Sequence, residues 1–157
     1  MLRRALAIVA LVLAADQATK WWILAAVMQP PRILEMTGFF NLVLVWNRGI
    51  SFGLLGDGGQ SQAWLLAAFG TLVAGGLLVW VQRGALSALA TAGAGLVAGG
   101  ALGNVVDRLR FGAVMDFLDL HLGGWHWPAF NVADSAITLG VVLLLVDAAL
   151  QERRARS

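Results

Sequence analysis

The chain has 157 residues, of which 59% are hydrophobic and 13% are charged, and its formal net charge is +2. Because an average soluble domain is about 45–50% apolar and about 25% charged, this composition indicates a polytopic membrane protein, with residues 1–157 forming a single domain. The absence of cysteine excludes disulfides, thiolate metal sites and a cysteine nucleophile. The sequence has no basic stripe with interleaved aromatic residues, so nucleic-acid binding is not expected.

The first predicted membrane span covers about residues 5–28. Its opening, MLRRALAIVALVLAADQ, also resembles a signal peptide, because two arginines precede an apolar core. Apolar character resumes after Lys20 as WWILAAVM, however, where a cleaved mature chain normally turns polar. We therefore predict a retained helix in which Asp16 and Lys20 lie on one face.

Three further spans are predicted over about residues 62–81, 85–106 and 131–150. The third is rich in small residues, and its glycines would let neighbouring helices approach closely: Gly93, Gly95, Gly99, Gly100 and Gly103. The predicted fold class is an all-α membrane protein with four transmembrane helices.

The arginines predict the orientation of the bundle. One side carries both termini and a very short turn, and its flanking arginines are Arg3, Arg4, Arg83, Arg153, Arg154 and Arg156. By the positive-inside bias, both termini are predicted to be cytoplasmic. The two longer connections, about residues 29–61 and 107–130, therefore face outward, and any chemistry is expected there.

The first outer connection contains the short apolar run LVLVW at 42–46, followed by Asn-Arg-Gly. It is too short to span a membrane as a helix and is typical of a strand. We predict a small extracytoplasmic β-sheet at the membrane surface, with short helix or loop segments in the outer connections. Trp46 and Phe52, and Trp125 and Trp127 in the second connection, are expected at the level of the lipid headgroups.

The chain has nine acidic residues. Four of them are explained by solvation or charge pairing, and the role of a fifth stays open. Glu35 and Asp57 are predicted to be solvated in an outer loop. Asp147 and Glu152 lie near the arginine cluster, where charge pairing is expected. The role of Asp119 stays open, because DFLDLH alternates like an edge strand, on which its carboxylate would face water.

The other four acids are Asp16, Asp107, Asp116 and Asp134. An acidic side chain within a span costs about 2.5–3.5 kcal/mol on insertion scales, so such residues are rarely accidental. The last three are predicted to meet at one depth near the outer surface, because the third and fourth helices are antiparallel neighbours.

Helix capping is the alternative explanation for these polar residues. Asn131 or Asp134 can cap the fourth helix, and Asp107 can pair locally with Arg108. Capping explains single residues, but it explains less well why several gather with Asn47 and Asn104.

Two carboxylates near contact share one proton, because both cannot ionise cheaply. The ionised carboxylate can take a proton from water while the protonated one polarises a carbonyl, which is the chemistry of an aspartic peptidase. Spacing alone does not choose between Asp107 and Asp116 as the partner of Asp134.

Other chemistries have weaker signals. The metal motif HExxH is absent, although a metal site built from Asp116, His121 and His126 is possible. A Ser–Lys dyad would need Lys20 beside Ser51 or Ser135. No metal or cofactor is predicted. A proton channel would need acids at mid-span, where only Asp16 is a candidate, and a purely structural membrane partner is the remaining class.

Five stretches identify a resemblance when they are taken in order. They are DQATK at 16–20, NRGISFGLL at 47–55, GGALGNVVDR at 99–108, VMDF at 114–117 and FNVADSAI at 130–137. With four spans at matching spacing, the chain resembles the lipoprotein signal peptidase (signal peptidase II) family over essentially its whole length.

The resemblance implies an aspartic endopeptidase of the bacterial inner membrane with an outward, periplasmic active site. It implies cleavage of prolipoproteins just before a cysteine that carries diacylglycerol, contact with membrane lipids, and inhibition by cyclic peptide antibiotics. It assigns catalysis to Asp116 and Asp134, and makes the sheet around residues 33–53 a cradle for the substrate. It assigns supporting roles to Asp16, Lys20, Asn47, Asn104, Asp107, Arg108 and Asn131.

Overall fold

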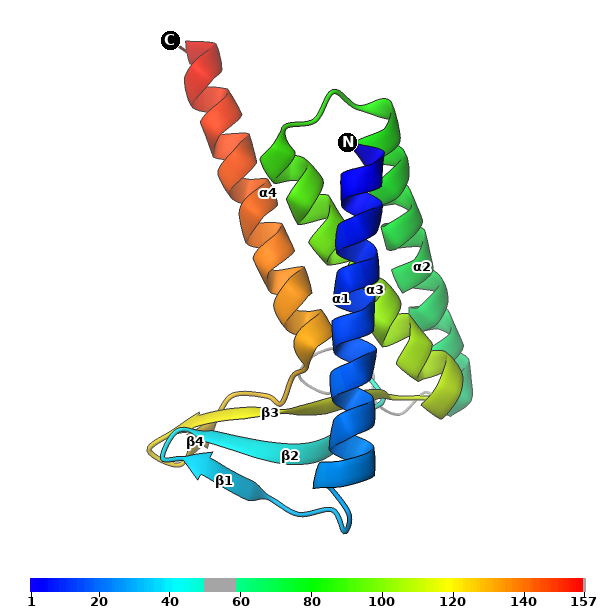
Figure 1. Cartoon of the computed structure of the whole chain (residues 1–157), viewed down its shortest axis with the longest axis vertical. Coiled ribbons are helices and arrows are strands. Elements are labelled where there is room, and N and C mark those ends of the chain that lie inside the picture. The colour runs from blue at the N-terminus through cyan, green and yellow to red at the C-terminus, as the bar shows by residue number, and fades with distance from the viewer. Residues whose placement is uncertain (50–58, 157) are drawn as a thin grey trace.

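The computed structural model describes residues 1–49 and 59–156, and it contains a bundle of long helices with a small sheet at one end (Figure 1). The helices are α1 (Leu2–Trp22), which continues into the π-helical turn η1 (Ile23–Val27), α2 (Gly59–Arg83), α3 (Ala88–Phe111) and α4 (Val132–Arg156). Within the described residues, four helical segments are long and apolar enough to cross a membrane. The predicted four-span fold class is therefore confirmed.

Helix α3 is the centre of the bundle, and its glycines allow the close packing. A Cβ atom on Gly99 would lie 2.9 Å from Val12 Cβ of α1, and one on Gly93 would lie 2.8 Å from the Gly140 carbonyl oxygen of α4. Helices pack this closely in membranes where small residues line the contact. The glycine-rich third span is thus a packed helix, as predicted.

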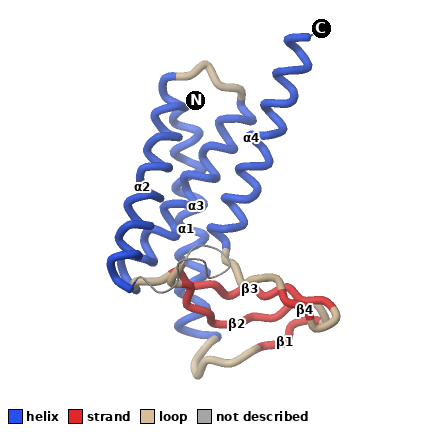
Figure 2. The backbone as a smooth tube through the Cα atoms, turned by 180° about the vertical axis from the view of Figure 1, so that it is seen from behind, coloured by secondary structure: helices blue, strands red, loops and turns tan. Residues whose placement is uncertain are grey.

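The sheet has four antiparallel strands in the order β1-β2-β3-β4 (Figure 2). They are β1 (Leu34–Thr37), β2 (Phe40–Asn47), β3 (Val114–Leu122) and β4 (Trp125–His126). The predicted strand at 42–46 lies within β2. In β2 and β3, Val45 faces Asp116 and Asn47 faces Val114. The register therefore brings the last residue of β2 next to the first residue of β3.

A cluster of buried apolar side chains joins the sheet to the helices. Ile23 of η1 and Met28, which follows η1, pack with Met115 and Phe117 of β3. Burial of side chains of this size contributes about 1.5–3 kcal/mol each. This contact fixes β3, and every residue on it, relative to the helical bundle.

The structure resolves the role of Asp119 that the sequence left open: its carboxylate is buried and does not face water. Strand β3 lies between β2 and β4, and Asp119 is only 7% exposed. Its carboxylate accepts hydrogen bonds from Asn41 Nδ2 at 2.9 Å and meets His126 Nδ1 at 2.9 Å. Burial alone would raise the pKa of Asp119, but the contacts with His126 and Asn41 hold that pKa below its ordinary value.

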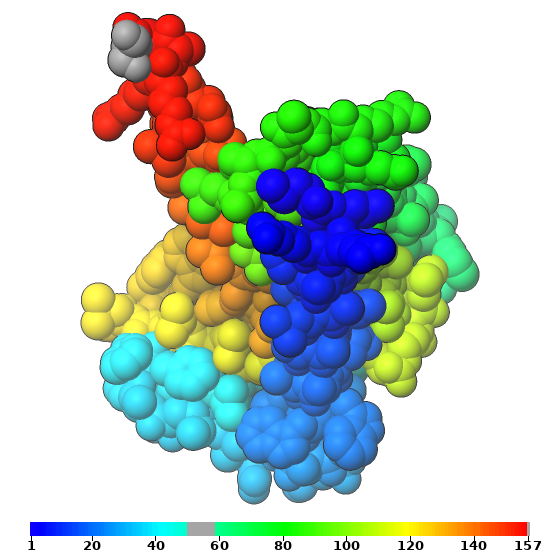
Figure 3. Space-filling model, turned by 45° about the horizontal axis from the view of Figure 1, so that its top comes forward, coloured from blue at the N-terminus to red at the C-terminus, as the bar shows by residue number. Residues whose placement is uncertain are grey.

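Both termini lie at the end of the bundle opposite the sheet (Figures 1 and 2). Figure 3 shows the C-terminal part of α4 projecting beyond the other helices. There Glu152 pairs with Arg156, as expected, and Asp147 accepts a hydrogen bond from Ser87. The predicted grouping of the termini on one side and the long connections on the other agrees with this arrangement.

Exposed aromatic side chains lie at the sheet end of the molecule. Trp125 is 62% exposed, Trp127 is 49% exposed and Trp46 is 40% exposed. Glu35 is exposed too, as predicted. The expectations for Phe52 and Asp57 concern residues outside the described ranges.

Candidate active site

The Asp116 side chain is fixed by two asparagines from different elements. Asp116 belongs to β3 and is 2% exposed. Its Oδ1 accepts a hydrogen bond from Asn131 Nδ2 at 2.7 Å, and its Oδ2 accepts one from Asn47 Nδ2 at 3.1 Å. Asn47 ends β2 and Asn131 immediately precedes α4, so the carboxylate lies where strand and helix meet.

The Asp134 side chain is in the first turn of α4 and takes part in a reciprocal cap. Its Oδ2 accepts the Asn131 N–H at 3.2 Å, while Asn131 Oδ1 accepts the Asp134 N–H at 2.9 Å. This pair of bonds is a capping box. The remaining oxygen, Oδ1, accepts a hydrogen bond from Asn104 Nδ2 at 2.8 Å. Capping therefore holds Asp134 in place, in addition to any chemical role.

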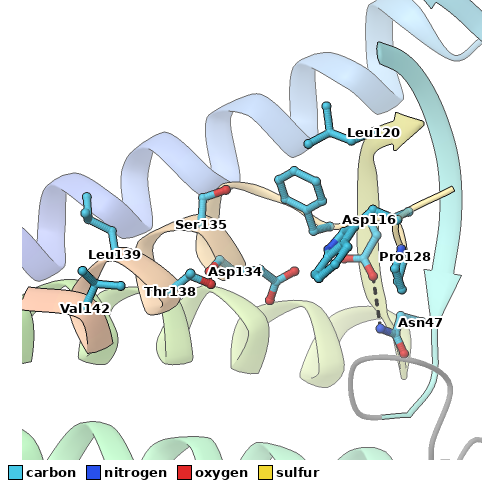
Figure 4. Close-up of a pocket in the computed structure, with 12 residues that line it drawn as sticks. Asn47, Asp116, Leu120, Pro128, Asp134, Ser135, Thr138, Leu139 and Val142 are labelled. Carbon is cyan, nitrogen blue, oxygen red and sulfur yellow. Dashed lines mark hydrogen bonds between the residues drawn. The ribbon is translucent and has the colours of Figure 1, made fainter. Parts of the chain in front are cut away.

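Asp116 and Asp134 line the same cavity, which has a volume of about 630 Å³. In Figure 4 their carboxyl groups point into the space between α4 and β3. Much of its wall is apolar, with Leu120, Leu139 and Val142 among the lining residues. A second cavity, of about 350 Å³, also reaches Asp134 and is lined by residues of α2, α3 and α4.

The electrostatics of the pair favour a shared proton. Burial, together with the negative charge of Asp134, raises the pKa of Asp116 to about 7, against the opposing effect of hydrogen bonds from Asn47 and Asn131. A carboxyl group with this pKa is partly protonated near neutral pH. The pair can then act as an acid and a base within one cavity.

Asp107 pairs with Lys20 rather than with Asp116 or Asp134. Its Oδ2 lies 2.8 Å from Lys20 Nζ, and Lys20 Nζ is also 2.9 Å from Asp16 Oδ2. All three side chains are buried. The expected shared face of Asp16 and Lys20 is present, and Asp107 completes an ion triad with them.

Arg108 does not form the expected local pair with Asp107. Its Nη2 donates to the Gly49 carbonyl oxygen at 3.1 Å and its Nη1 to the Asn104 carbonyl oxygen at 3.4 Å. Arg108 also lines the second cavity. It therefore connects α3 to the chain just after β2.

The Ser–Lys alternative has no support in the described residues. The ammonium group of Lys20 is held by two carboxylates, and Ser135 Oγ donates to the Asn131 carbonyl oxygen at 3.0 Å. Ser51 lies outside the described ranges.

The metal site proposed from Asp116, His121 and His126 is not formed. His126 contacts Asp119, and His121 Nε2 lies 3.3 Å from Asn41 Oδ1. In the parts of the chain that the structure describes, no group of three His, Cys, Asp or Glu side chains could hold a metal ion.

Gln17 is the polar residue that sequence reasoning missed. Its Nε2 donates to Asp16 Oδ2 at 3.1 Å and to Asp107 Oδ1 at 3.0 Å. The available signal was an amide inside an apolar span beside Asp16, in the DQATK stretch. Among the predicted supporting residues, the three asparagines contact the Asp116–Asp134 pair: Asn47, Asn104 and Asn131.

A four-helix membrane bundle with two carboxylates on one cavity is the arrangement expected of a membrane aspartic peptidase. The model of the signal peptidase (SPase) II family, Peptidase_A8, matches residues 8–150. The chain belongs to this signal peptidase II family, whose members remove signal peptides from prolipoproteins.

Individual relatives agree with the family assignment. The lipoprotein signal peptidase of Burkholderia thailandensis is 50% identical over 125 residues, covering 78% of this chain and 74% of that protein. The corresponding protein of Paraburkholderia phytofirmans is 48% identical over 122 residues, covering 78% and 71%. A solved structure of a bacterial membrane enzyme matches with a TM-score of 0.83 and 28% identity, covering 98% of this chain and 92% of that one.

Proposed function

We propose that Asp116 and Asp134 are the catalytic pair with which this signal peptidase cleaves its substrate. The observation that carries the proposal is that both carboxylates line one cavity while the pKa of Asp116 is raised to about 7. The ionised carboxylate takes a proton from a water molecule, which attacks the carbonyl carbon of the scissile peptide bond. The protonated carboxyl group donates a hydrogen bond to the carbonyl oxygen, and a proton then passes to the leaving amine.

Three asparagines orient the catalytic pair in this proposal. Asn47 and Asn131 donate to the two oxygens of Asp116, and Asn104 donates to Asp134. Amide donors stabilise the ionised form of a carboxylate without adding charge. They therefore fix the geometry while leaving the pair able to hold one proton.

Arg108 is proposed to bind a backbone carbonyl of the substrate. Its Nε is buried and has no hydrogen-bond partner among the residues that the structure describes. A buried donor without a partner costs about 1–3 kcal/mol, and a substrate carbonyl beside the second cavity would remove that cost.

The substrate is proposed to be a prolipoprotein whose cysteine carries diacylglycerol. The apolar cavity walls suit a signal peptide and acyl chains that remain partly in the lipid. In this proposal the sheet supports the substrate on the side of the cavity opposite α4. We place the chain in the bacterial inner membrane with both termini cytoplasmic and the site at the periplasmic face, on the arginine distribution. Cyclic peptide antibiotics that occupy the cavity would block the pair.

The test is cleavage of a purified precursor in its diacylglyceryl-modified form and in its unmodified form. We expect cleavage of the modified form only. Asp116→Asn and Asp134→Asn should each lower kcat by at least about 1,000-fold, because a proton-transfer partner is lost. Asp147→Asn, at the opposite end of α4, is the matched control and should stay active. Retained activity in both site variants would contradict the catalytic assignment.

A further inference from the structure

We propose that Asp16, Gln17, Lys20 and Asp107, called here the bundle cluster, set the spacing of the catalytic pair by holding the backbone next to each aspartate. The inference rests on the proposed function of Asp116 and Asp134. It makes the four side chains positioning residues, which act on the reaction through the backbone rather than by touching substrate.

The first arm of the bundle cluster is Asp16. Its Oδ1 accepts the backbone N–H of Ala133 at 3.0 Å, and Ala133 is fully buried. Ala133 directly precedes Asp134 in the first turn of α4. Its N–H is one of those that an α-helix leaves without an internal partner, so a carboxylate from α1 satisfies it and fixes the position of this turn.

The second arm is Asp107. Its Oδ2 accepts the backbone N–H of Met115 at 3.1 Å, and Met115 is also fully buried. Met115 directly precedes Asp116 in β3. The two arms are therefore equivalent: each carboxylate of the bundle cluster binds the N–H group immediately before one catalytic aspartate.

Lys20 and Gln17 join the two arms. Lys20 Nζ lies 2.9 Å from Asp16 Oδ2 and 2.8 Å from Asp107 Oδ2, and Gln17 Nε2 donates to both carboxylates. Two buried carboxylates repel each other and lose hydration, so a buried charge is tolerated only when it is paired and hydrogen-bonded. One ammonium group and one amide thus determine the separation of both arms.

This separation matters because the chemistry requires two carboxylates at a defined distance. A displacement of about 1 Å at a reacting group can lower the rate about 100-fold. The bundle cluster lines neither cavity that the catalytic pair faces. Its loss should therefore change kcat, while KM, which reflects substrate contacts, should remain close to the wild-type value.

The test compares Asp107→Leu with Asp107→Asn in the cleavage assay, with kcat expressed per folded molecule. Leucine removes the acceptor for the Met115 N–H. Asparagine keeps one oxygen for that N–H and loses the acceptor for Gln17 Nε2, which still donates to Asp16 Oδ2. We expect Asp107→Leu to lower kcat about 100-fold with KM within about twofold, and Asp107→Asn to recover at least about tenfold of the loss.

Gln17→Met is the second variant, because Asp107→Leu can fail to fold. It removes both bridging donors while keeping side-chain length, and we expect kcat to fall about tenfold at unchanged KM. Thr19→Ala is the control on the same helix, because Thr19 bonds only to carbonyls of its own turn in the contacts described. It should leave kcat unchanged.

The positioning role is overturned if kcat per folded molecule of Asp107→Leu stays within about twofold of wild type, if its loss appears in KM, or if asparagine is no better than leucine. Should Asp107→Leu not fold, wild-type kcat in Gln17→Met overturns it. These outcomes are separate from failure of the catalytic assignment, which would appear as activity in Asp116→Asn and Asp134→Asn.

Discussion

Two clusters of buried polar side chains differ in what they connect. The bundle cluster links α1 and α3 to the N–H groups that precede Asp134 and Asp116. The second, called here the sheet cluster, consists of Asn41, Asp119, His121 and His126, and it links β2, β3 and β4 to one another. Both hold carboxylates that would be costly to bury alone, but of the two only the bundle cluster bonds to the backbone next to the proposed catalytic pair.

The partners of the carboxylates also differ between the two clusters. In the bundle cluster the cation is Lys20, which is 4% exposed. In the sheet cluster the partner is His126, whose side chain is 54% exposed and therefore screened by water. A change in the bundle cluster should thus alter catalysis, whereas a change in the sheet cluster should alter the local stability of the sheet.

Among the variants that compare the two regions, Gly103→Ala, which disturbs the bundle cluster sterically, should have an effect as large as that of Asp107→Leu. The new Cβ would lie 2.7 Å from Asp16 Oδ2 and 3.3 Å from Ala133 Cβ. The displaced Asp16 would release the N–H before Asp134, so we expect kcat to fall about 100-fold in the cleavage assay. Gly75→Ala is the control, because its Cβ would have no atom within 4 Å. Equal kcat in Gly103→Ala and Gly75→Ala would contradict the claim that a change in the bundle cluster alters catalysis.

The next effect concerns the pH dependence of cleavage. Because the pKa of Asp116 is raised to about 7, the catalytic pair loses its shared proton as the pH rises through that value, and kcat/KM should fall above it. Charged groups facing Asp116 are Asp134 and Lys20, with Arg108 from α3.

Asn47→Ala should move the alkaline limb of this profile to higher pH. The Asn47 hydrogen bond stabilises the ionised form of Asp116, so its removal raises the pKa of Asp116 further. The measurement is kcat/KM between about pH 4 and about pH 10, about three units to either side of the wild-type pKa of about 7. A limb that moves to lower pH would refute the sign of this contribution.

A smaller effect is expected from Asp119→Asn in the sheet cluster. Loss of the charged hydrogen bonds should lower the free energy of unfolding by about 1–3 kcal/mol, with kcat unchanged. The pKa of Asp119 is held below its ordinary value, so its contribution is present above about pH 4, the unfolded value, and is lost as the pH falls through the lower folded pKa.

Thermal unfolding in detergent, followed by tryptophan fluorescence, measures this loss. The nearby reporters are Trp125 and Trp127, whose rings are 5.8 Å apart. Glu35→Gln is the control, because Glu35 is an exposed acid on the same sheet. A large fall in kcat for Asp119→Asn would remove the distinction between the two clusters.

The smallest effect is expected at the opposite end of the bundle. Asp147→Asn weakens the bond with Ser87 and should lower the free energy of unfolding by less than about 1 kcal/mol. Ser87→Ala should cost more, about 1 kcal/mol or above, because Ser87 Oγ also accepts the Ala90 N–H as the N-cap of α3. The same thermal unfolding measurement ranks the two variants, and the reverse order would contradict this prediction.

Much of the fold could be predicted from the sequence because the signals are local. Apolar runs of about 20 residues indicate membrane helices, and the short apolar run at 42–46 indicated the strand that is part of β2. The role of Asp119 stayed open because strand pairing joins distant segments. An alternating pattern does not tell which side chains the neighbouring strands supply, here Asn41 of β2 and His126 of β4.

The candidate site was predictable in its members but not in its connections. The acids and asparagines were recognisable as costly polar residues near membrane spans. Asp107 and Asp116, in contrast, have the same residue type and similar spacing from Asp134. Only the structure separates them, because Asp107 binds Lys20 while Asp116 shares a cavity with Asp134.

The sequence by itself determined the four spans, the side on which the arginines gather and the set of polar residues, because hydrophobicity and charge are properties of single residues and short runs. Tertiary structure alone decided which carboxylates meet, that Gln17 belongs with Asp16 and Asp107, and that the N–H groups before both catalytic aspartates are bound by one cluster. These contacts join residues far apart in the chain, and their distances depend on helix packing at Gly99 and Gly103, which no local pattern specifies.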